Sequence, residues 1–214
     1  MKTSQINLSL LLLLSAAAII VSKAGNSLLN VEELYYQSLS ANLTAQQIEK
    51  TFEVQKKIQW MYYIIATIAT LIKTMIISGI LFTGLLISDR SGTCFNQVWT
   101  SVLKAEFIFV LAGIAKIVWF SFFQTGYSLQ DLQYFYPLSI LNIIGYGGLE
   151  IWFVYPLQII NLFEFCYIIF LALEIGRLIH ANAGQGLRIV ASTSQQLSVN
   201  LNLKYTAWRM IYFV

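Results

Sequence analysis

The chain has 214 residues, of which 57% are hydrophobic and only 11% are charged, and its mean hydropathy is +0.68. A soluble domain carries about 25% charged residues, so this chain has too little polar surface to dissolve, and we expect it to lie in a lipid bilayer. Its net charge is only +3 and its 13 Lys and Arg residues are dispersed, which argues against nucleic acid as a partner.

Residues 1–24 are typical of either a secretory signal peptide or an N-terminal membrane anchor. Lys2 precedes an apolar run over residues 8–21, and small residues follow at Ser22 and Ala24. This order predicts cleavage after Ala24. The run of about 14 residues is shorter than the roughly 20 that a membrane helix needs. Both interpretations stay open.

Residues 25–58 form a polar segment that ends in an amphipathic lead-in helix. Thr44-Ala-Gln-Gln47 matches a capping box, which indicates a helix that begins just after Thr44. Ile48 and Phe52 then share one helical face. We expect this helix to continue directly into the first certain span.

Residues 59–180 form the membrane bundle, and residues 181–214 form a polar tail that ends in a short apolar helix. The certain spans are predicted at 60–88, about 103–124 and about 157–179. Glu174 and Arg177 lie three residues apart at the end of the last span, so they are expected to pair.

A repeated phrase holds the only two prolines of the chain. It reads Tyr136-Pro-Leu-Ser-Ile-Leu-Asn142 and then Tyr155-Pro-Leu-Gln-Ile-Ile-Asn161. Proline is favoured in the first turn of a helix, so we expect each phrase to mark a helix start, at Pro137 and at Pro156. The first helix ends before Gly145 after about 12 Å and is too short to cross, so it is interfacial or re-entrant. The second begins a full span.

Three charged residues fall within the predicted spans: Lys73, Lys116 and Glu164. Each costs at least about 2.5 kcal/mol at mid-membrane unless it is paired or hydrated. Lys116 and Glu164 both lie about 12 Å from the same end of two antiparallel spans, which predicts an ion pair between them. Lys73 would join this pair or face a polar cavity. The cluster would either fix the helix register or act as a proton or substrate relay.

Three stretches carry a resemblance to a known family. They read LTAQQIEKTFEVQKKIQWMYYII, KAEFIFVLAGIAKIVWF and YFYPLSILNIIGYGGLEIWFVYPLQIINLFEFCYIIFLALEIG. Over about residues 43–180, the chain resembles the bacterial branch of the Yip (Ypt-interacting-protein) membrane domain family. The resemblance implies a bundle of about five membrane helices without known catalytic chemistry. Eukaryotic members associate with trafficking GTPases, and some bacterial members are described as permease-like.

The expected fold is all-α: a polytopic bundle of about four to five membrane helices with one short interfacial or re-entrant helix. The chain has a single histidine and no HExxH or P-loop motif, so we expect no catalytic, cofactor or metal site. The expected function is that of a Yip-like scaffold or subunit of a membrane complex, in the bacterial inner membrane. Its partners would be the lipid bilayer and other subunits or copies of itself. The alternative is a permease or transporter subunit with a polar site around Lys73, Lys116 and Glu164.

Overall fold

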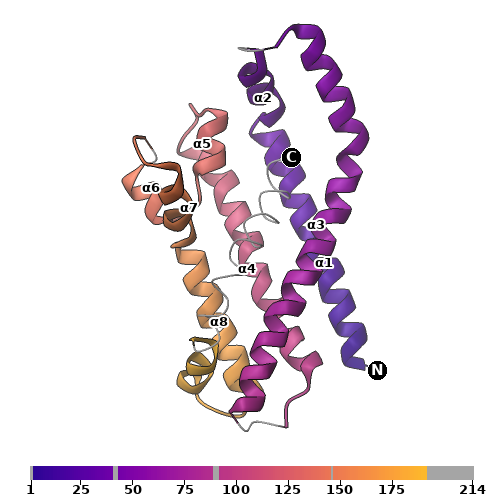
Figure 1. Cartoon of the computed structure of the whole chain (residues 1–214), viewed down its shortest axis with the longest axis vertical. Helices are drawn as coiled ribbons and strands as arrows, with labels where there is room; N and C mark the ends of the chain where they lie inside the picture. Colours follow the sequence, from indigo (N-terminus) through magenta and orange to yellow (C-terminus); the bar gives the residue numbers. More distant parts are fainter. Residues whose placement is uncertain (1, 41–42, 89–91, 146, 192–214) are drawn as a thin grey trace.

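The computed structural model describes residues 2–40, 43–88, 92–145 and 147–191, and these residues form helices without a β-strand. The helices are α1 (Lys2–Leu28), α2 (Val31–Ser40), α3 (Ala45–Ile87), α4 (Phe95–Phe122), α5 (Leu129–Tyr134), α6 (Ile140–Ile144), α7 (Ile151–Ile159) and α8 (Leu162–Leu178) (Figure 1). A further helical segment covers residues 183–191. The apolar helix that we expected at the end of the chain lies outside the described residues.

Three helices, α1, α3 and α4, are long and apolar enough to cross a membrane. The structure therefore confirms an all-helical membrane protein. The expected count of four to five spans is not established, because α8 has only 17 residues, about 26 Å, and falls just short of the roughly 30 Å hydrocarbon core.

Helix α1 contains the whole of residues 2–24 and packs along α4 (Figure 1). Leu11 and Leu14 are buried in one cluster with Leu103 of α4. Asn7 is fully buried: its side-chain amide donates to the carbonyl of Asn96 at 3.0 Å and accepts from the Thr100 hydroxyl at 2.5 Å. The first helix is thus an integral part of the bundle in this structure.

Helix α3 begins where the capping box predicts. Its N-cap is Thr44, whose backbone N–H donates to the Gln47 side chain at 3.0 Å, and the helix continues without a break for 43 residues. At its start the ring of Phe52 contacts the rings of Tyr35 and Tyr36, which fix α2 against it. The prediction of a lead-in helix that continues into the first certain span is confirmed.

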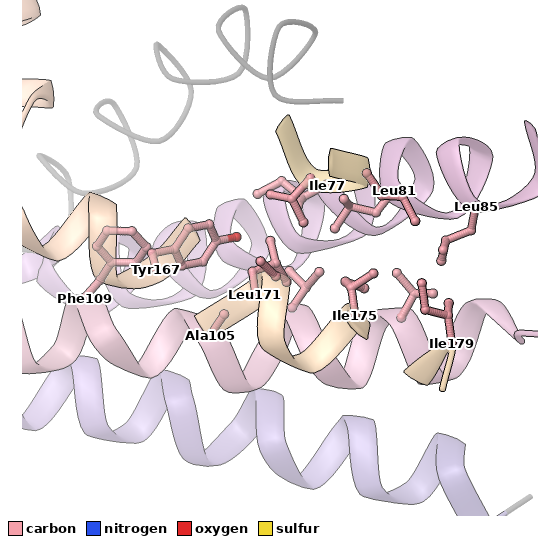
Figure 2. Packing of buried hydrophobic residues seen from close by; sticks show 14 residues of the cluster. Ile77, Leu81, Leu85, Ala105, Phe109, Tyr167, Leu171, Ile175 and Ile179 are labelled. Carbon is pink, nitrogen blue, oxygen red and sulfur yellow. The ribbon is translucent and has the colours of Figure 1, made fainter. Parts of the chain in front are cut away.

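Helix α4 lies at the centre of the bundle and packs against α1, α3 and α8 (Figure 1). The main core forms where α3, α4 and α8 meet, and Figure 2 shows their side chains pointing toward one another. Its fully buried members include Leu81, Leu85, Val98, Val102, Ala105, Leu171 and Ile175. This packing holds the charged groups described below between the helices.

The segment 183–191, which we expected to be part of a polar tail, closes one end of this core. Ile189 and Val190 are buried in the cluster formed with α8 and its neighbours. Gly186 lies directly against the backbone of α8: a Cβ atom built there would be 2.1 Å from the carbonyl oxygen of Ala172 and 2.9 Å from the amide nitrogen of Gly176. Only glycine permits so close an approach.

We expect Gly186→Ala to destabilise the folded protein by about 1–3 kcal/mol, the usual cost of overpacking, since the clash is with backbone that cannot rotate away. Thermal unfolding in detergent measures the effect. Gly184→Ala is the matched control, because Gly184 lies in the same helical segment and has nothing within 4 Å of its added Cβ. Equal melting temperatures for the two variants would contradict this packing.

Candidate functional site

A buried ion pair joins α3 to α4. Lys73 Nζ donates to Glu106 Oε2, and the two side chains are only 9% and 3% exposed. Lys73 lies 14 residues, about 21 Å, before the end of α3 at Ile87. Glu106 lies 11 residues, about 17 Å, after the start of α4 at Phe95. The pair is therefore deep within the hydrophobic length of both helices.

Aromatic rings surround this ion pair. Lys73 Nζ lies 5.5 Å from the ring centroid of Phe109, a cation–π contact. The ring of Tyr167 on α8 lies 5.0 Å from the same Phe109 ring (Figure 2), and its phenol interacts with the Glu106 carboxylate. Both Glu106 Oε1 and Tyr167 Oη are fully buried. Helices α3, α4 and α8 thus share one polar centre, which we call the Lys73–Glu106 centre.

The structure corrects the prediction that Lys116 pairs with Glu164. The buried pair is Lys73 with Glu106, and Lys116 Nζ instead donates to the backbone carbonyl of Leu132 at 2.6 Å. Leu132 belongs to the last turn of α5, where a cation is favoured by the helix dipole. Lys116 is thus a buried C-terminal partner for α5.

The helix boundaries explain this error. The prediction counted helix turns from Pro156, but α8 begins only at Leu162, so Glu164 lies in the first turn of α8 and not eight residues into the helix. Conversely, α4 begins eight residues before the predicted residue 103, so Glu106 lies well inside it. A cap was readable in the sequence, since Cys94 and Gln97 form the start of α4. A helix that begins after Cys94 places Glu106 well inside the span, where an unpaired carboxylate is costly, so Glu106 would have been expected to have a partner.

A second set of charges lies toward the other end of α8. Arg177 Nη1 contacts Glu174 Oε1 at 3.0 Å, so the predicted pairing of these residues is confirmed. Lys104 of α4 contacts the other oxygen of Glu174 at 2.9 Å. Lys104 and Arg177 are substantially exposed, and exposed pairs contribute only about 0–1 kcal/mol each. These residues form a second, partly exposed charge group between α4 and α8.

The repeated phrases lie side by side. Their backbones form an antiparallel bridge between Ser139 and Asn161, with Ile140 N donating to Ile160 O at 3.0 Å and Leu162 N donating to Leu138 O at 3.2 Å. The repeat therefore pairs two chain segments, α5–α6 and α7–α8, at one end of the bundle.

Neither proline occupies the helix start that we predicted. Pro137 lies in a turn closed by Ser139 N and Tyr136 O at 3.2 Å, and Leu138 after it has φ = +57°. Proline followed by a residue with positive φ is typical of a type II turn. Pro156 lies inside α7, which already begins at Ile151.

The caps of α6 and α8 are instead the polar residues Ser139 and Asn161. Their side chains accept from the backbone N–H groups of Asn142 and Glu164, which a proline ring cannot do.

The break between α7 and α8 leaves backbone groups that the buried amides satisfy. Asn161 Nδ2 donates to the carbonyls of Gln158 and Ile159 at 3.1 and 2.8 Å. Gln158 Nε2 donates in turn to the carbonyl of Tyr134 at 2.9 Å. The other predicted positions of the repeat, Tyr136, Asn142 and Tyr155, are not the N-cap residues of α6, α7 or α8, which are Ser139, Glu150 and Asn161. The protein's own side chains therefore form hydrogen bonds with backbone carbonyls around the break between α7 and α8.

The fold and these centres define an α-helical membrane protein whose intramembrane charges are bound inside the helix bundle. Across the described ranges, no group of three or more His, Cys, Asp or Glu side chains is placed to hold a metal ion. No model of a known protein family, no curated protein and no solved structure matches this chain.

Glu106→Gln is expected to lower the free energy of unfolding by about 3–5 kcal/mol, because it leaves the Lys73 ammonium buried without its counter-charge. Glu164→Gln is the matched control: its carboxylate lies in the first turn of α8, where the loss of a favourable charge costs about 0.3–1 kcal/mol. Chemical unfolding in mixed micelles compares the two. A larger effect at Glu164 would restore the original prediction and contradict the Lys73–Glu106 centre.

Asn161→Ala is expected to destabilise the protein by at least the roughly 0.5–2 kcal/mol of a lost N-cap, since it also removes the amide that donates to the carbonyls of Gln158 and Ile159. Asn142→Ala tests the equivalent position of the other phrase, where the exposed side chain lies inside α6, whose N-cap is Ser139. The readout is the melting temperature of each purified variant. A comparable loss in both would mean that the phrases act as equivalent units.

Proposed function

We propose that this chain is a non-catalytic integral membrane protein that acts as a scaffold or subunit of a membrane complex. The observation that carries this proposal is the closed state of the Lys73–Glu106 centre. A permease site needs charges that a hydrated substrate or ion can reach. Here the two side chains are almost completely buried, and they are bound to each other and packed against aromatic rings.

The broken helix supports the same conclusion. In transporters, a discontinuous helix offers its free backbone groups to a substrate. In this chain the carbonyls of Gln158 and Ile159 are bound by Asn161, so they are occupied before any substrate arrives. A surface hollow near Glu32, Tyr36 and Phe52 lies among α1, α2 and the start of α3, and none of Lys73, Lys116 and Glu164 lines it.

The outer faces of the bundle supply the surface for partners. Large apolar side chains are exposed on α3 and on α8, including Ile68, Ile72, Phe165 and Ile169. Such faces contact lipid, another subunit or a second copy of the chain. The resemblance to the bacterial Yip domain that we predict over residues 43–180, which no family model matches, would imply the same role. On the same basis we propose the bacterial inner membrane as its location.

Site-specific photo-crosslinking in native membranes tests the proposal. A photoreactive residue is placed at Ile169, which is 56% exposed on α8, and in a matched variant at Leu171, which is fully buried on the same helix. We expect a discrete protein adduct from position 169 only, which mass spectrometry then assigns to a membrane subunit or to a second copy.

Adducts to lipid alone at position 169, together with substrate accumulation by vesicles that depends on Glu106, would overturn the scaffold role in favour of transport. Capture of a nucleotide-binding subunit would do the same, since it would indicate an energised transporter. The exposed Lys56–Glu32 pair between α2 and α3 offers a control for uptake, because it lies outside the Lys73–Glu106 centre.

A further inference from the structure

The region around the repeated phrases exposes a concentrated apolar surface. We consider residues 136–145 and 147–161, which include α6 and α7 (Figure 1). Their exposed large side chains are Leu138, Ile143, Ile144, Trp152, Phe153, Tyr155 and Ile160. Ile143 is 84% and Trp152 is 75% exposed. An apolar surface of this kind is covered by lipid or by protein rather than by water.

The height of this surface along the bundle follows from the packing of α8 on α4. The Phe109 and Tyr167 rings are in contact, which sets the two antiparallel helices at the same level. From there α4 continues 13 residues, about 20 Å, to Phe122, whereas α8 continues only five residues, about 8 Å, to Leu162. Helix α4 therefore extends about 12 Å beyond the start of α8.

The last turns of α4, which extend beyond the start of α8, are apolar. Their side chains include Ile117, Val118, Trp119 and Phe122, and Val118 and Phe122 are exposed. These turns therefore lie at the level of the lipid chains. The chain just before α8 therefore also lies at the level of the lipid chains and not at the level of the headgroups.

The distribution of charged residues supports this depth in the membrane. From residue 117 to residue 176 the chain has no Lys or Arg, the residues that anchor surface helices to lipid headgroups. Trp152, at the start of α7, has its indole N–H bound to Glu150 Oε2 at 2.6 Å, so its polar edge is satisfied beside a carboxylate while the ring is exposed. Tryptophan with this arrangement is typical of the boundary between headgroups and lipid chains.

We propose that residues 136–145 and 147–161 form a wedge that enters the hydrocarbon of one leaflet, on the side of the membrane away from the N-terminus, and that lipid acyl chains are its partner. The wedge also completes the membrane length that the 17 residues of α8 lack.

Two measurements on the full-length protein in lipid vesicles test this proposal. The first labels Ile143→Cys with a membrane-impermeant maleimide, in a background where Cys94 and Cys166 are serine; Thr125→Cys, in the polar connection after α4, is the water-exposed control. The second compares tryptophan quenching by lipids brominated on the acyl chains in the wild type and in Trp152→Phe. Trp119→Phe is the control, because that ring is stacked between Phe123 and Phe135.

We expect Thr125→Cys to be labelled and Ile143→Cys to resist labelling until detergent is added, and we expect Trp152→Phe to remove more of the acyl-chain quenching than Trp119→Phe. Labelling of Ile143→Cys as fast as Thr125→Cys would place the segment in water and overturn the proposal. Protection of Ile143→Cys without quenching of Trp152 by brominated lipid would assign the surface to a protein partner or a second copy, which also overturns it. The scaffold role is tested separately on α8, so either proposal can fail alone.

Discussion

The Lys73–Glu106 ion pair is the interaction on which the arrangement of the bundle depends. Either charge alone is unfavourable in the hydrocarbon, and the pair forms only where Lys73 on α3 and Glu106 on α4 lie at the same level. A buried pair contributes less to net stability than its strength suggests, because both ions lose their hydration. Its main effect is to disfavour every other register of the two helices. Tyr167 brings α8 to the same point.

Several other buried polar groups of the described residues are also hydrogen-bonded within the bundle. Lys116 holds the end of α5, and Gln158 and Asn161 bind the carbonyls around the break between α7 and α8. In lipid there is no water to replace such partners, so backbone that leaves the helical pattern must be satisfied internally. The wedge proposal for residues 136–145 and 147–161 requires the same internal satisfaction of backbone groups.

Much of the fold was predictable because it follows from local chemistry. The hydrophobic composition predicts a helical membrane protein, and the Thr44 capping box places the start of α3. The partners within the bundle were not predictable in the same way. An error of a few residues in a helix boundary moves a charge by a full turn or more, which is why Glu164 was chosen in place of Glu106. The close approach of Gly186 to α8 has no local signal at all, because it depends on two segments packing together.

A double-mutant cycle between Lys73 and Glu106 tests the central claim most directly. Lys73→Met, Glu106→Leu and the combined variant are unfolded chemically in the same mixed micelles as the wild type. We predict that each single change costs about 3–5 kcal/mol and that the combined variant recovers a large part of that loss, since no unpaired charge remains buried. Additive losses, with no coupling between the two positions, would contradict the account.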